Sequence, residues 1–158
     1  MKYQVKISTW VVRIALAAAF LSAVADRLGF WGAPGEPGVA WGDVAHYEAY
    51  VGQLNGFLPL ALISPVGWLA TLAEIIIAIG LLVGWQLRYF SLAAGILLTI
   101  FATAMCVAFG IKSPLDYSVF SAAGAAYLLY STTLYDNAAG WTSQIETATQ
   151  GPDDPATH

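Results

Sequence analysis

The chain has 158 residues, the length of one ordinary domain. Hydrophobic residues make up 58% of it and charged residues only 10%, whereas soluble globular domains contain about 45–50% and about 25%. This composition excludes an intrinsically disordered chain, and the net charge of −4 without a basic run excludes a nucleic-acid partner. The sequence therefore indicates a protein that is folded for the lipid bilayer.

Four apolar stretches are long enough to cross a membrane as helices, which takes about 20 residues. They cover approximately residues 7–25, 65–85, 89–109 and 114–135. Ser64-Pro65 and Ser113-Pro114 each offer a cap followed by a proline at the first helical position. We therefore predict an all-α fold for residues 1–135, an integral membrane four-helix bundle, with a polar acidic cytoplasmic tail over 136–158.

The first stretch has a second interpretation. Lysines precede it, and Ala23-Val24-Ala25 resembles the cleavage site of a signal peptide, but we expect the segment to be retained. Lys2, Lys6 and Arg88 lie on one side of the predicted bundle, and Arg27 and Lys112 lie on the other, which leaves a small excess on the first side. Because cytoplasmic flanks carry more Lys and Arg, this bias favours cytoplasmic N and C termini in a multi-pass protein of the inner membrane.

The external loop between the first two spans, residues 26–64, is long and rich in aromatic residues. Within it, apolar residues recur at helical spacing from Val44 onward, and Asp43 can cap a helix. We predict an additional amphipathic interfacial helix over 43–58. It either fixes the depth of the protein in the membrane or covers an outward-facing pocket. His46 is interpreted as an interfacial histidine rather than a catalyst.

The most informative ionisable residue is Glu74, which lies near the middle of the second span. A carboxylate at that depth is costly unless it is protonated or paired. Arg13 in the first span is its natural partner, so we predict that Arg13 and Glu74 meet in the bundle interior. The pair either sets helix register or handles protons or a ligand.

Two further polar groups are candidates for ligand binding. Thr99 and Tyr127 lie near the height of Glu74, where their hydroxyl groups bond a ligand or bond each other across helices. A second cluster is expected at the outer mouth, either as capping and anchoring residues or as a site for the polar head of a lipid-soluble ligand. It consists of Asp26, Arg27, His46, Lys112, Asp116 and Tyr117.

Cysteine and histidine are too few for several cofactor sites. Cys106 is the only cysteine, which excludes an internal disulfide, and we interpret it as a small buried side chain. His46 and His158 are the only histidines, which excludes a haem between two transmembrane histidines and a four-ligand Cys/His zinc site. We expect no metal and no cofactor held within the chain.

Three segments resemble the DoxX family of small bacterial four-helix membrane proteins. They are SAVADRLGFWGAPGEPGVAWGD after the first span, TLAEIIIAIGLLVGWQLRY in the second and KSPLDYSVFSAAGAAYLL in the fourth. The resemblance implies a bundle in the bacterial cytoplasmic membrane and a redox context, because the family is named after a subunit of a thiosulfate:quinone oxidoreductase. It supplies no catalytic motif to transfer.

Three functions fit these observations. The first is a subunit of a membrane oxidoreductase complex, with a protein partner that holds the redox centre and a quinone or other hydrophobic-ligand pocket in this chain. The second is a non-enzymatic accessory, assembly or anchoring protein of a larger complex. The third, a small-solute carrier, is weakened because the sequence has no evident inverted repeat.

Overall fold

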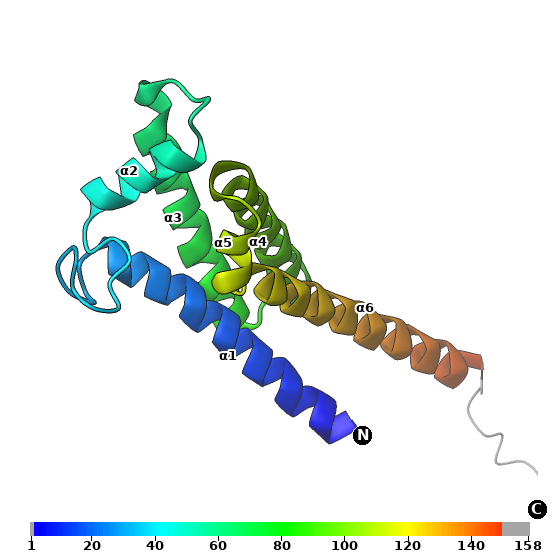
Figure 1. The fold of residues 1–158 in the computed structure, drawn as a ribbon. Coiled ribbons are helices and arrows are strands. Elements are labelled where there is room, and N and C mark those ends of the chain that lie inside the picture. Colours follow the sequence, from blue (N-terminus) through cyan, green and yellow to red (C-terminus); the bar gives the residue numbers. More distant parts are fainter. Residues whose placement is uncertain (1, 150–158) are drawn as a thin grey trace, which may run out of the picture.

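The computed structural model describes residues 2–149 of the chain, with side chains described for residues 6–135. In this part of the chain, helices are the regular secondary structure, and loops connect them. The described residues form six helices, whose arrangement is shown in Figure 1. They are α1 (Lys2–Arg27), α2 (Val44–Leu54), α3 (Leu60–Val83), α4 (Leu87–Phe109), α5 (Lys112–Asp116) and α6 (Val119–Thr149). The predicted all-α fold is confirmed for this part of the chain.

Three of these helices are long and apolar enough to cross a membrane, namely α1 over Lys6–Arg27, α3 and α4. The chain is thus a multi-pass membrane protein. The predicted fourth span over 114–135 is not among them, and it is divided between α5 and α6 at Ser118, whose φ is 55°. The four-helix count therefore stays a prediction. The expected tail begins inside α6, and residues 150–158 lie outside the described residues.

The start of α3 corrects one prediction from the sequence. The helix begins at Leu60, so Ser64 is not its cap and Pro65 lies inside it. The reason is packing that the local sequence does not reveal. Helix α2 lies against these first turns, and the Ser64 hydroxyl donates a hydrogen bond to the Glu48 carboxylate of α2. In the same way α5 begins at Lys112, so Ser113 is not a cap.

The core is formed where α1, α3, α4 and α6 meet. Its buried residues are Leu16, Ala17, Phe20, Ile77, Ala78, Leu81, Ala94, Ala126 and Leu129. Several of them are alanines, which allow helices to approach closely in a membrane. Large apolar side chains outside this core remain exposed along α1, α3 and α4, as expected for helices whose outer faces contact lipid.

The contact between α4 and α6 depends on a glycine, and it yields a first testable prediction. A Cβ atom at Gly95 would lie 2.8 Å from the Tyr127 ring. We therefore expect Gly95→Ala to lower the free energy of unfolding by about 1–3 kcal/mol, the usual cost of overpacking. The measurement is denaturant unfolding in detergent.

The matched control for this prediction is Gly124→Ala in α6. A Cβ at Gly124 meets nothing within 4 Å. Because alanine is the better helix former by about 1 kcal/mol, this variant should be neutral or more stable than the natural protein. Equal effects of the two substitutions would contradict the role of Gly95 as the space that receives Tyr127.

Candidate functional site

The main polar cluster is a buried ion pair between the end of α1 and the middle of α3. Arg27 Nη2 lies 2.9 Å from Glu74 Oε2 and donates a hydrogen bond of 3.3 Å to Glu74 Oε1. Arg27 Nη1 also donates to Thr71 Oγ1 at 2.7 Å. Both charged side chains are less than 5% exposed. The buried carboxylate thus has a cationic partner, as its position requires.

An aromatic ring of α2 and another from the loop before it cover this pair. The Arg27 guanidinium lies 4.0 Å from the centre of the Tyr47 ring and 5.2 Å from that of Trp41. The Tyr47 hydroxyl donates to the Gly67 carbonyl at 3.2 Å. Burial raises the pKa of Tyr47, so its phenol stays neutral. Arg27 is therefore held by an anion, a hydroxyl and two aromatic faces at once.

The predicted contact between Arg13 and Glu74 is wrong. Arg13 instead donates from Nε to the Leu81 carbonyl at 2.7 Å and from Nη2 to the Leu82 carbonyl at 2.9 Å. These carbonyls are at the end of α3, where helical partners are lacking and a cation is favoured. At 1.5 Å per residue, Leu82 lies about 12 Å along α3 from Glu74.

This error has a physical origin at the end of the first span. The sequence estimate ended that span at residue 25 and left Arg27 in the outer polar region. In the structure α1 continues through Arg27, and the side chain turns inward to the middle of α3. Arg27 thus moves from the expected outer cluster to the buried site.

Asp26 performs a role that the sequence analysis missed. Its carboxylate accepts three backbone hydrogen bonds, from Ala40 at 2.9 Å, Trp41 at 2.7 Å and Gly42 at 3.0 Å. It therefore ties the loop over residues 28–42 back to the end of α1. The only local signal was an acidic residue at the end of an apolar span, which does not identify a partner fourteen residues away.

The rest of the expected outer cluster does not converge. Lys112 and Asp116 form an exposed pair with each other, one turn apart on α5. The neighbouring Tyr117 is also exposed. Among the described side chains, none of these three forms a hydrogen bond or an ion pair with Asp26 or Arg27. The outer-mouth residues thus form separate groups rather than one ligand site.

Asp43 caps the start of α2, as predicted, and accepts hydrogen bonds from His46 in the first turn of the helix. The His46 backbone N–H donates to Asp43 Oδ1 at 2.8 Å, and His46 Nδ1 lies 2.9 Å from the same oxygen. The His46 side chain is exposed and pairs with the Asp43 carboxylate. This helix ends at Leu54 rather than at residue 58, because Asn55 closes it by bonding back to the Val51 carbonyl.

This cap makes the start of α2 sensitive to acid. Hydrogen bonds from His46 lower the pKa of Asp43 from its ordinary value of 3.8. The stabilising effect is therefore present above pH 3.8 and lost as the pH falls through the lowered pKa. We expect amide hydrogen exchange at residues 44–47 to accelerate in that range. The Asp43→Asn variant, which caps without titrating, should show no such step; the same acid step in both proteins would contradict this assignment.

Thr99 and Tyr127 lie together, in agreement with the alternative in which their hydroxyl groups bond each other across two helices. Thr99 Oγ1 and Tyr127 Oη are 3.1 Å apart and join α4 to α6. Both residues are exposed on the surface of the helices. Cys106, expected as a buried side chain, is partly exposed within α4.

The cavity beside Arg27 is small, about 10 Å³, which is close to the minimum for one water molecule. It is lined by Arg27, Val44, Tyr47, Glu48, Gly67, Trp68 and Thr71. Among the residues that the structure describes, no group of three metal-ligating side chains lies together. The site around Arg27 is therefore better suited to holding helices together than to enclosing a large ligand.

Comparison with known protein families assigns the chain to one of them. Residues 5–116 match the family described as methylamine utilisation protein MauE. Since the match covers more than half of the chain, the protein belongs to this family. The expected DoxX membership is therefore wrong, because the family whose model matches the chain is MauE, a different family. Neither a curated protein nor a solved structure matches the chain.

Proposed function

We propose that this member of the MauE family is a non-catalytic accessory subunit of the membrane machinery with which a bacterium utilises methylamine. The family name supplies the process. The observation that carries the accessory role is that the buried charged side chains of this site find their partners within the chain itself. Glu74 Oε2 forms an ion pair with Arg27, although it accepts no hydrogen bond. Arg27 bonds Glu74 and Thr71, and Asp26 bonds three backbone amides. Such groups stabilise a shape that a protein partner recognises.

Removal of the gene from its host tests this proposal. We expect growth on methylamine to be lost, growth on an unrelated substrate with ammonium to be unchanged, and a plasmid copy to restore growth. The purified protein alone should not turn over methylamine with an artificial electron acceptor. Normal growth on methylamine without the gene, or turnover by the isolated chain, would overturn the accessory role.

A second candidate function, quinone binding within an oxidoreductase complex, is supported by the Thr99–Tyr127 pair. Both residues are exposed at the α4–α6 contact, where a lipid-soluble carbonyl compound can approach their hydroxyl groups from the bilayer. The test is extraction of quinone from gently purified protein. Co-purified quinone that is lost in a Thr99→Val, Tyr127→Phe variant supports this function, and absence of quinone from the natural protein contradicts it.

We also propose that both termini lie in the cytoplasm. Lys6 and Arg88 are exposed at the end of the molecule that carries the α3–α4 turn, whereas Lys112 is exposed at the α2 end. This asymmetry agrees with the excess of positive charge in cytoplasmic flanks. Protease protection of a C-terminal tag in right-side-out vesicles supports this orientation, and its digestion contradicts it.

A further inference from the structure

We propose that two exposed apolar segments, residues 28–31 and 57–60, are lipid anchors that hold α2 on the surface of the bilayer. Phe30 and Trp31 in the first anchor are 78% and 60% exposed. Phe57 and Leu60 in the second are 80% and 91% exposed. Contiguous exposed apolar groups of this kind mark a surface that contacts a membrane or a partner.

The first anchor continues the lipid-facing side of α1. Trp31 Nε1 donates a hydrogen bond of 3.0 Å to the Ser22 carbonyl, more than one turn before α1 ends. The indole therefore lies back along a helix that is long and apolar enough to cross the membrane. Ser22 and the preceding Leu21 are themselves exposed on that helix. An indole with a bonded N–H beside a membrane helix is typical of the aromatic belt.

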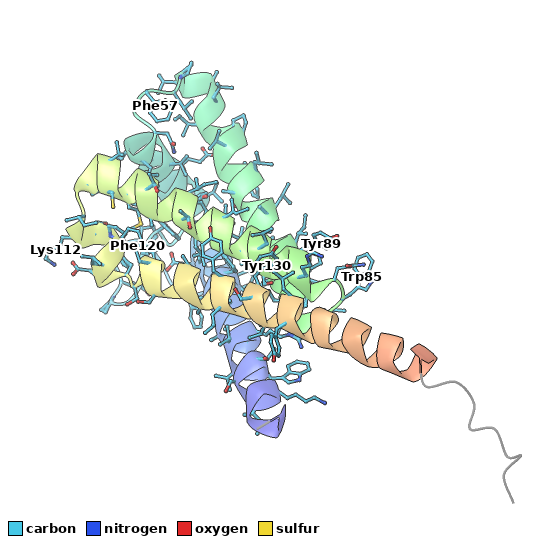
Figure 2. The ribbon with its side chains drawn as sticks, turned by 90° about the vertical axis from the view of Figure 1, so that its right-hand side faces the viewer. Phe57, Trp85, Tyr89, Lys112, Phe120 and Tyr130 are labelled. Atoms are coloured by element: carbon cyan, nitrogen blue, oxygen red, sulfur yellow. The ribbon has the colours of Figure 1, made fainter. Side chains whose placement is uncertain are left out.

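The second anchor lies at the start of another membrane helix. Phe57 and Leu60 are at the turn from α2 into α3, at the opposite end of α3 from Trp85. Figure 2 shows Phe57 at this tip, far from Trp85 and Tyr89 at the α3–α4 turn. Aromatic side chains thus mark both ends of α3, as they do for helices that extend between the two membrane surfaces.

The helix between the anchors has the polarity of an interfacial element. Figure 1 shows α2 between the loop that follows α1 and the start of α3. Tyr47 and Val51 of α2 are buried against the bundle, whereas His46 and Gln53 are exposed. Lipid suits the apolar anchors at the two ends, and water suits the polar side chains between them. Because the Asp26 carboxylate fixes the end of the loop that carries the first anchor, that anchor is held in place before it meets lipid.

Spin labelling of the full chain tests this proposal cleanly, because Cys106 is the only native cysteine. In a Cys106→Ala background, single cysteines are introduced at Phe30, Phe57 and Leu60, with matched exposed controls at Glu36 and His46. The labelled proteins are placed in phosphatidylcholine nanodiscs, and collision rates with oxygen and with a water-soluble nickel chelate are measured. Gel filtration and helical circular dichroism confirm that each variant is folded.

The expected result is a severalfold higher ratio of oxygen to nickel collisions at residues 30, 57 and 60 than at residues 36 and 46. Equal ratios at all five positions would show that the segments face water, and this would overturn the proposal. Protection of the three positions from both reagents would also overturn it, because it would show that protein, rather than lipid, covers them.

Discussion

Replacing Glu74 by leucine is expected to lower the free energy of unfolding by about 3–5 kcal/mol, the usual effect of removing one partner of a buried ion pair. The Arg27 guanidinium would remain beneath α2 without its anion, 2.9 Å from where the carboxylate oxygen had been. Denaturant unfolding in detergent measures the loss. Removing the other partner, by Arg27→Met, should lower the free energy of unfolding by a similar amount, because it leaves the carboxylate unpaired.

A double-mutant cycle makes this prediction specific for the observed partner. The combination of Arg27→Met and Glu74→Leu should recover much of the lost stability, because two apolar side chains replace two charges. Arg13→Met combined with Glu74→Leu should be additive within about 0.5 kcal/mol, as expected for distant sites. Coupling of Glu74 to Arg13 rather than to Arg27 would contradict the site described above.

The helices could largely be predicted from the sequence, whereas the partners of the buried charges could not. Apolar stretches of membrane length identify α1, α3 and α4, because a helix must satisfy its own backbone in lipid. A position along a helix also indicates that Glu74 needs a cation. It does not indicate which cation, because Arg13 and Arg27 lie four turns apart on one helix and both are buried.

The positions at which α1 and α3 end determine which of the two arginines meets Glu74. Arg13 meets the carbonyls at the end of α3, and Arg27 meets Glu74, because α1 continues through Arg27 and crosses α3 at that level. Both facts depend on how α1 and α3 are aligned, because the contacts join residues that are 47 to 69 positions apart in the chain. The same holds for α3, whose start at Leu60 is stabilised by α2 rather than by a local cap.

The loop tie at Asp26 gives the second large effect. We expect Asp26→Ala to lower the free energy of unfolding by several kcal/mol, because hydrogen bonds to a charged group contribute about 1.5–3 kcal/mol each and three are lost together. The backbone amides of Ala40, Trp41 and Gly42 should then exchange faster with solvent. Because Asp26→Asn keeps one acceptor oxygen, its free energy of unfolding should lie between those of the natural protein and of Asp26→Ala.

The matched control is Glu36→Ala, which removes an exposed carboxylate from the same loop and should change stability by less than about 0.5 kcal/mol. Limited proteolysis separates the two, because only the Asp26 variant should be cut rapidly between residues 28 and 42. Since Trp41 and Tyr47 cover Arg27, loosening this loop should also weaken the coupling between Arg27 and Glu74. Unchanged coupling energy in the Asp26→Ala background would show that α2 stays in place without the loop.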